Sequence, residues 1–145
     1  MAGKQNLQSI SIRPYIPKDY PSIRRILEEG GLYYDEMDNE NRLKEKVTRD
    51  PQSILVAIEA SRIIGTVSIM EDGRMAFIFR LGVQMEQKGS GVGTRLLQEA
   101  ETILHERGYN EVHILVDENN PELQKYYEQR GYERGHMYCW MSKEF

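Results

Sequence analysis

Between Ser53 and Val83 the chain carries three apolar runs separated by two polar breaks, and this pattern restricts the fold more than any other feature. The runs are SILVAI, RIIGTVSIM and MAFIFRLGV, and the breaks are EAS and EDGR. Val, Ile and Phe favour strands, and Asp-Gly between apolar runs is a strong hairpin signal. We therefore predict three consecutive strands in an antiparallel meander. Gly82 interrupts the last one near its end, which indicates a bulge or the close approach of another part of the structure.

The stretch QKGSGVG, from Gln87 to Gly93, joins this meander to a segment with helical periodicity. Apolar residues beyond it recur on one helical face, namely Val92, Leu96, Leu97, Ala100, Ile103 and Leu104. Glycine is costly inside regular structure because it loses the most backbone freedom on folding. Three glycines at alternate positions therefore predict a loop between strand and helix, in which side chains do not block the approach of a ligand.

The rest of the chain predicts further strands and helices. Helices are expected at 19–30, in a short segment before Pro51 and at 120–131, and further strands at 9–13, at 111–117 and once or twice after residue 131. The strand–helix–strand order of the second half requires parallel pairing. We predict an α/β (α+β) fold: a mixed, mostly antiparallel central sheet of six to seven strands with helices on both faces.

Composition and charge favour a single soluble globular domain over residues 1–145, in which residues 1–8 are expected to be loose. The chain is 39% hydrophobic and 29% charged, which are ordinary values for such a domain. Its net charge of -4 disfavours unspecific binding to nucleic acid or to anionic membranes. No apolar run is long enough for a signal peptide or a membrane span.

Cysteine and histidine usage bears on compartment and metal binding. The single cysteine, Cys139, allows no intramolecular disulfide, and this favours a reducing cytoplasm. The three histidines are scattered along the chain, so no metal site is predicted.

A glycine-rich loop before a helix is suited to bind an anion. Its backbone N–H groups can point into one concavity, and the helix adds free N–H groups and the positive end of its dipole. Phosphate or pyrophosphate is the usual occupant, with Lys88 nearby as added positive charge. A dinucleotide fingerprint fits poorly because the spacing from Gly91 to Gly93 is one residue too short. A triphosphate loop fits poorly because no lysine follows Gly93.

In these motifs the sequence resembles the Gcn5-related N-acetyltransferase (GNAT) family, over essentially the whole chain. The family signature, Arg/Gln-x-x-Gly-x-Gly/Ala, matches KGSGVG at 88–93, with Lys88 in place of the usual Arg or Gln. A second family pattern, Asn followed seven residues later by Tyr and then by Gly-Phe/Tyr, matches Asn120, Tyr127 and the pair at 131–132. Leu123 stands where the family often has Ala.

The resemblance implies acetyl-CoA as the co-substrate and no metal. The glycine loop would hold its pyrophosphate, and the pantetheine arm would lie where the fourth strand splays from the fifth. The implied cofactor-binding residues are Leu81, Gly82, Val83, Lys88, Gly89, Ser90, Gly91, Val92, Gly93, Thr94 and Asn120. Asn120 is at least as well explained as a plain helix cap.

The implied reaction is the direct transfer of acetyl to a primary amine. A backbone N–H near Val83 would stabilise the oxyanion, and Tyr127 would protonate the leaving thiolate as general acid. A tyrosine on the apolar face of a helix is more often a core residue, and only the motif favours catalysis here. No general base is assigned; the candidates are Glu71, Asp72, His113, Asp117 and Glu118.

The acceptor is expected to be a small-molecule or peptide amine. The family binds it near the first helices, where Tyr33, Tyr34 and Asp35 are the candidates and Glu36 and Asp38 add negative charge. The other reading of this stretch is a solvated loop. A non-catalytic acyl-CoA-binding sensor or interaction module on the same fold is the alternative function. A homodimer is compatible with a domain of this size and is left open.

Overall fold

The computed structural model describes residues 9–145, which divide into two compact units. The first ends at Ile114 and contains the sheet and the glycine loop, and the second runs from Leu115 to Phe145. The expectation that residues 1–8 are loose lies outside the described residues.

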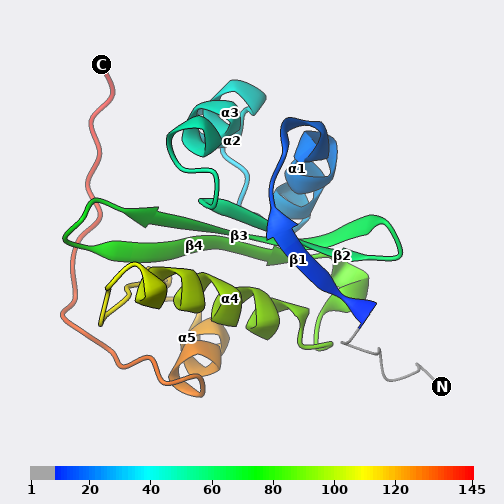
Figure 1. Ribbon diagram of the computed structural model, residues 1–145. Coiled ribbons are helices and arrows are strands. Elements are labelled where there is room, and N and C mark those ends of the chain that lie inside the picture. The colour runs from blue at the N-terminus through cyan, green and yellow to red at the C-terminus, as the bar shows by residue number, and fades with distance from the viewer. Residues whose placement is uncertain (1–8) are drawn as a thin grey trace. The chain divides into compact units, whose positions relative to one another are not determined.

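Four strands in sequence order form one antiparallel sheet in the first unit (Figure 1). They are β1 (Ser11–Pro14), β2 (Ile54–Glu59), β3 (Arg62–Glu71) and β4 (Ala76–Val83). The last three coincide with the three apolar runs, so the predicted meander is confirmed. β1 begins two residues later than the alternation of the sequence predicts.

The two turns of the meander differ in chemistry. Gly73, in the β3–β4 turn, has a φ of 87°, and the Asp72 carboxylate accepts hydrogen bonds from two backbone N–H groups of the turn, each at 2.8 Å. In the β2–β3 turn, Ala60 and Ser61 have φ values of 48° and 65°, the left-handed region that a tight hairpin requires. Neither residue favours that region, so strand pairing on both sides imposes this turn.

Helices cover both faces of this sheet, as predicted (Figure 1). On one face lie η2 (Pro17–Asp19), α1 (Tyr20–Glu29), α2 (Asp35–Asp38) and α3 (Glu40–Arg49), and on the other lies α4 (Val92–Glu106). The helix predicted before Pro51 is therefore α3.

Two glycines of the sheet lie very close to helices. A Cβ at Gly82 would lie 3.0 Å from Ile26 Cγ2 of α1, and a Cβ at Gly65 would lie 2.8 Å from Leu96 Cδ1 of α4. The close approach predicted at Gly82 is thus confirmed, and α1 is the element that approaches. The core between α1, α3 and the sheet is apolar, with Tyr15, Tyr20, Ile23, Leu27, Leu43, Ile54 and Val56 buried in one cluster.

The second unit contains α5 (Pro121–Glu128), and its sequence explains where that helix begins. Asn120 accepts a hydrogen bond from the Leu123 N–H at 3.1 Å, and Pro121 fits the first helical position, which needs no N–H. The remaining residues of the unit are irregular. No helix of the described residues is both long and apolar enough to cross a membrane.

The prediction of six to seven strands is wrong, because residues 9–145 contain four. The segment expected as a fifth strand, at 111–117, keeps one isolated parallel bridge, between Phe77 and His113. The segment after residue 131 forms no strand, and its Tyr138 and Trp140 are 85% and 78% exposed. Extended chain becomes a strand only where a neighbour accepts and donates its backbone hydrogen bonds. The sheet therefore has no fifth strand from which β4 could splay.

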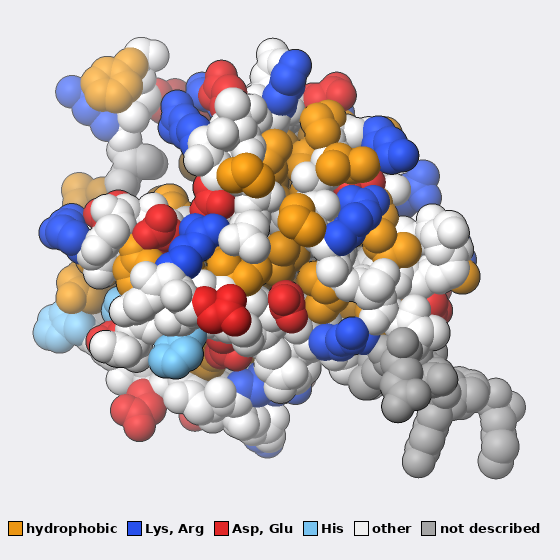
Figure 2. Space-filling view, viewed as in Figure 1, with side chains coloured by type: hydrophobic (Ala, Val, Ile, Leu, Met, Phe, Trp, Pro, Cys, Tyr) orange, Lys and Arg blue, Asp and Glu red, His pale blue; other side chains and the backbone are white. Residues whose placement is uncertain are grey.

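Charged side chains of both signs are interspersed on the face drawn in Figure 2, where Lys and Arg do not gather in one stripe.

Candidate functional site

The glycine loop connects β4 to α4 and owes its shape to two of its glycines. Its first turn is η3 (Met85–Gln87). Gly89 and Gly91 have φ values of 82° and 90°, which glycine adopts without steric cost. Gly91 is also the N-cap of α4, and Gly93 lies in the first turn of that helix.

Some backbone N–H groups of this loop already donate hydrogen bonds within the protein, and others are candidates to donate to a ligand. The amides of Lys88 and Ser90 donate to carbonyls three residues before each of them, at 3.3 and 3.1 Å. The N–H groups of Gly89, Gly91 and Gly93 are the candidates for a ligand, beside the positive end of the 15-residue helix α4. A Cβ at Gly89 would meet no atom within 4 Å, so the loop is open on that side. The backbone of the loop is therefore uncovered on the side of Gly89.

A β-bulge lies in β4 just before this loop. Thr66 pairs with Gly82 and Ser68 pairs with Phe79, so the single residue between them on β3 faces Arg80 and Leu81 on β4. Arg80 has a φ of 54°. The bulge predicted from Gly82 thus occurs, one to two residues earlier in the chain.

The outer edge of β4 is paired over only part of its length. The Ile78 N–H donates to the His113 carbonyl and the His113 N–H to the Ala76 carbonyl, each at 2.9 Å. Within residues 9–114, no further outer-edge bond continues this pairing towards Leu81 and Val83. The end of β4 therefore has an outer edge that residues 9–114 leave without strand pairing.

The residues predicted at the acceptor side form a hydrogen-bonded group between α1 and α2. The Tyr33 hydroxyl donates to Asp35 Oδ1 at 2.8 Å and lies 3.0 Å from the Tyr20 hydroxyl. Hydrogen bonding to Tyr20 is the main reason why the pKa of Tyr33 is raised. Tyr34 is 49% exposed and faces solvent. Tyr33 and Asp35 are therefore already paired with each other, and Tyr34 is the accessible aromatic side chain.

Sequence reasoning missed the role of Arg80 and gave Asp38 a different one. Arg80 Nε lies 3.1 Å from Asp38 Oδ1 and Arg80 Nη2 lies 3.2 Å from Asp38 Oδ2, so the two side chains form a bidentate pair. Asp38 is buried. Its charge is consequently matched by Arg80 and is not presented to an incoming amine. The sequence carries no local signal for this pair, because its two residues lie 42 positions apart.

Asn120 and Tyr127, the remaining predicted site residues, share α5 in the second unit. The Asn120 side-chain oxygen caps the helix. Tyr127 is buried and packs edge-on against Tyr132, with ring centroids 5.5 Å apart. Burial raises the pKa of Tyr127 to about 12. Its hydroxyl therefore stays protonated at neutral pH, as a general acid requires.

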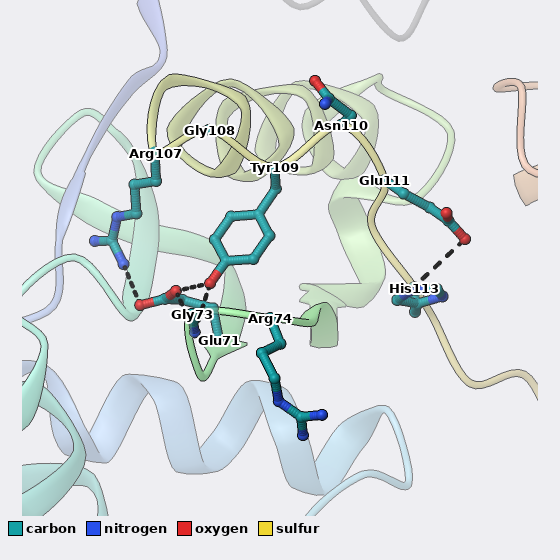
Figure 3. A pocket seen from close by; sticks show the side chains of 9 residues that line it. All are labelled: Glu71, Gly73, Arg74, Arg107, Gly108, Tyr109, Asn110, Glu111 and His113. Atoms are coloured by element: carbon teal, nitrogen blue, oxygen red, sulfur yellow. Dashed lines mark hydrogen bonds and ion pairs between the residues drawn. The ribbon is translucent and has the colours of Figure 1, made fainter.

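A polar pocket of about 370 Å³ lies between the β3–β4 turn and the end of α4 (Figure 3). At its centre Tyr109 donates a hydrogen bond to Glu71 and accepts one from the Gly73 N–H at 2.8 Å. Arg107 holds Asp50 through two bonds of 2.7 and 2.9 Å, and lowers the pKa of that carboxyl. These groups are paired within the protein, so the cluster serves to fasten the hairpin to the helix.

Three candidates for the general base belong to this part of the molecule. Glu71 and Asp72 precede β4, whereas the glycine loop follows it, and an eight-residue strand spans roughly 25 Å. His113 packs on the Phe77 ring, with centroids 5.3 Å apart, and its Nε2 lies 3.8 Å from a Glu111 carboxylate oxygen. Glu71 and Asp72 thus lie at the opposite end of β4 from the glycine loop. No group of three or more His, Cys, Asp or Glu that could hold a metal occurs in residues 9–145.

Comparison with known proteins gives one family. The sequence profile of the Acetyltransferase (GNAT) family matches residues 20–132, which include parts of both units. An acetyltransferase of Pectobacterium atrosepticum is 29% identical over 124 residues, which cover 86% of this chain and 88% of the relative.

Solved structures show the same fold. Ard1 from Thermoplasma volcanium superposes with a TM-score of 0.79 at 22% identity, covering 88% of this chain and 85% of that one. The PaiA N-acetyltransferase of Thermoplasma acidophilum, solved in complex with coenzyme A, gives 0.77 at 23% identity over 86% and 90% of the chains. Glucosamine-6-phosphate N-acetyltransferase from Arabidopsis thaliana gives 0.73 at 20% identity over 94% and 98%.

Proposed function

This chain belongs to the GNAT family of acetyltransferases, and we propose that it transfers an acetyl group from acetyl-CoA to a primary amine. The observation that carries the proposal is the glycine loop, in which Gly89 and Gly91 adopt left-handed backbone conformations at the start of α4. A pyrophosphate suits this place because it can accept several N–H bonds at once and is attracted by the helix dipole.

The residues of the loop fit acetyl-CoA in space and in charge. The open side of Gly89 gives room for a phosphate close to the backbone, where a larger residue would place a Cβ. Val92 and Thr94 belong to the predicted contact set, as does Ser90, although the Ser90 N–H and hydroxyl already donate to the Gln87 carbonyl. The exposed Lys88 supplies a positive charge beside it. The solved relative from Thermoplasma acidophilum, which holds coenzyme A, supports the same ligand class here.

We place the pantetheine arm along the outer edge of β4. Its amides can pair with the backbone groups of Leu81 to Val83, past the point where the pairing with His113 stops. The bulge takes Leu81 out of the regular ladder, and we assign an N–H of this stretch to the thioester carbonyl oxygen. A donor that is already oriented stabilises the oxyanion of the tetrahedral intermediate without reorganisation.

In the proposed reaction the neutral amine attacks the thioester carbonyl carbon, and the positively charged nitrogen of the adduct loses a proton to solvent water. The oxyanion then collapses and the carbon–sulfur bond breaks. The thiolate takes a proton from the Tyr127 hydroxyl, and Tyr127 recovers from solvent the proton that it gives to the thiolate. With a pKa of about 12, Tyr127 holds that proton throughout the neutral range, so its ionisation should not reduce the rate below about pH 10. The Asn120 amide nitrogen is the proposed cofactor donor, since the side-chain oxygen caps α5.

The acceptor is proposed to be a small-molecule or peptide amine that reaches the site past Tyr34. Tyr33 and Asp35 would orient it, Asp35 through the carboxylate oxygen that Tyr33 does not occupy. The alternative is an acyl-CoA-binding module that does not turn over. No acidic side chain that could act as general base lies on β4, and this observation favours the alternative.

Thiol release from acetyl-CoA in the presence of a panel of primary amines tests the proposal. We expect saturable release with at least one amine and a loss of about 100-fold in kcat for Tyr127→Phe. The matched control is Tyr126→Phe, which removes the neighbouring hydroxyl on the same helix and should stay within about twofold of wild type. Binding of acetyl-CoA without release on any amine would favour the module. Equal kcat for Tyr127→Phe and wild type would remove Tyr127 from the mechanism.

A further inference from the structure

The ion pair between Arg80 and Asp38 joins the two sides of the proposed reaction. Arg80 stands in the bulge of β4, where the thioester is proposed to lie, and Asp38 ends α2, the helix of the proposed acceptor segment. Asp38 is the more enclosed partner, with 6% of its side chain exposed against 23% for Arg80. Breaking such a pair leaves a buried charge unmatched, so the pair holds the two elements together.

Arg80 is kept in an unfavourable backbone conformation at this position. Its φ of 54° lies in the left-handed region, which a long side chain rarely occupies. Conformations of this kind persist only where surrounding contacts enforce them, and they gather at functional sites. Here the enforcing contacts are the bulge and the two bonds to Asp38.

Asp38 in turn determines the shape of the acceptor segment, residues 33–38. Its Oδ2 accepts the Tyr34 N–H at 2.8 Å, and its backbone carbonyl accepts the Tyr20 hydroxyl at 3.1 Å. The guanidinium also lies 3.8 Å from the Met37 sulfur. A chain of direct contacts therefore runs from the β4 backbone through Arg80 and Asp38 to the amide of Tyr34.

We propose that Arg80 is a positioning residue, which holds residues 33–38 against the donor strand and couples the order of this acceptor segment to occupancy of the acetyl-CoA site. The inference rests on the proposed function. Pantetheine paired along β4 would stiffen the bulge, and the stiffened bulge would fix the guanidinium. The segment that receives the amine would then be held more firmly once the donor is in place.

Hydrogen exchange with and without acetyl-CoA tests this coupling and needs no identified acceptor. The test variant is Arg80→Asn, because asparagine tolerates positive φ and is too short to reach Asp38. The matched control is Arg13→Asn. Arg13 also forms a bidentate pair with a buried aspartate, Asp19, at 2.7 and 3.0 Å, but that pair lies on β1 and η2.

In wild type and Arg13→Asn, acetyl-CoA should slow exchange of residues 84–94 and, by about fivefold or more, of residues 33–38. In Arg80→Asn the slowing at 84–94 should remain and that at 33–38 should fall below about twofold. Asp38→Asn, which keeps the side-chain shape, should behave like Arg80→Asn. For any amine that turns over, Arg80→Asn should raise its KM about tenfold and change the KM of acetyl-CoA by a smaller factor, and Arg80→Lys should restore part of the loss.

Three results would overturn the inference, and they differ in what else they reject. If residues 33–38 are protected equally in Arg80→Asn and in wild type, Arg80 does not carry the coupling. If acetyl-CoA protects 84–94 but never 33–38, no coupling exists. If acetyl-CoA protects neither segment in wild type, the proposed function fails and the inference fails with it.

Discussion

Lys46 of α3 should carry a stability penalty at pH 7 that disappears as the pH rises. Its Nζ donates a hydrogen bond to the Ile69 carbonyl at 2.6 Å and lies 5.0 Å from the centroid of the Phe79 ring. Burial lowers the pKa of Lys46 from 10.5 to about 8, and the nearby Asp50 offsets this only in part. The folded protein therefore binds this proton less tightly than the unfolded chain does.

The sign and size of the effect follow from that difference. Between about pH 8 and the unfolded value of 10.5 the unfolded chain binds more protons, so the free energy of unfolding rises with pH across this window. Below about pH 8 the penalty is fully present. The full pKa difference of Lys46 would raise the free energy of unfolding by about 2 kcal/mol between pH 7 and pH 9.5. Partial exposure of the side chain reduces this increase to about 1–2 kcal/mol.

Urea unfolding at pH 7 and pH 9.5 measures this contribution. Lys46→Met keeps an apolar side chain of similar length and removes the titrating group, while other titrating groups cancel in the comparison. The stability of wild type relative to Lys46→Met should rise by about 1–2 kcal/mol from pH 7 to pH 9.5. Lys44→Met, an exposed lysine change on the same helix, should follow wild type. A wild-type-to-Lys46→Met difference that is the same at both pH values would refute the reasoning.

Three glycine substitutions give further predictions. Gly65→Ala should destabilise the fold by about 1–3 kcal/mol in urea unfolding, because its Cβ would lie 2.8 Å from Leu96 Cδ1 and 3.2 Å from the Gly82 carbonyl oxygen; a neutral effect would mean that α4 can shift away from the sheet. Gly89→Ala and Gly108→Ala both place alanine at positive φ, 82° and 99°, with no atom within 4 Å, so each should cost about 1 kcal/mol of stability. Only Gly89→Ala should weaken acetyl-CoA binding, by about tenfold in calorimetry, and equal affinities would place the ligand elsewhere.

The parts of the fold that depend on local patterning were predictable from the sequence. The three apolar runs became β2, β3 and β4, and the periodic segment after Gly91 became α4. Asn120 and Pro121 marked the start of α5 correctly. In each case the residues that decide the element are neighbours in the chain, so their spacing carries the information.

What depends on distant partners could not be predicted. Residues 111–117 have a strand-like composition, but a strand also needs neighbours, and only His113 finds one. The left-handed turn at Ala60 and Ser61 is imposed by pairing, and the side-chain types give no sign of it. The Arg80–Asp38 pair joins residues 42 positions apart across a bulge, which no local spacing reveals.

The sequence also located the candidate site, but not the hydrogen bonds within it. The glycine spacing and its place between strand and helix located the loop, and the structure shows which of its amides are already used. Roles of individual site residues, Tyr127 above all, stay predictions until activity is measured.

Calorimetric titration of acetyl-CoA into the wild-type chain tests the central claim most directly, alongside a titration of S-acetylpantetheine, which lacks the pyrophosphate. The account predicts one saturable site per chain for acetyl-CoA and binding at least about tenfold weaker for S-acetylpantetheine, because only acetyl-CoA can engage the loop amides at the start of α4. Absence of binding, or equal affinity for both compounds, would contradict a pyrophosphate cradle in the glycine loop.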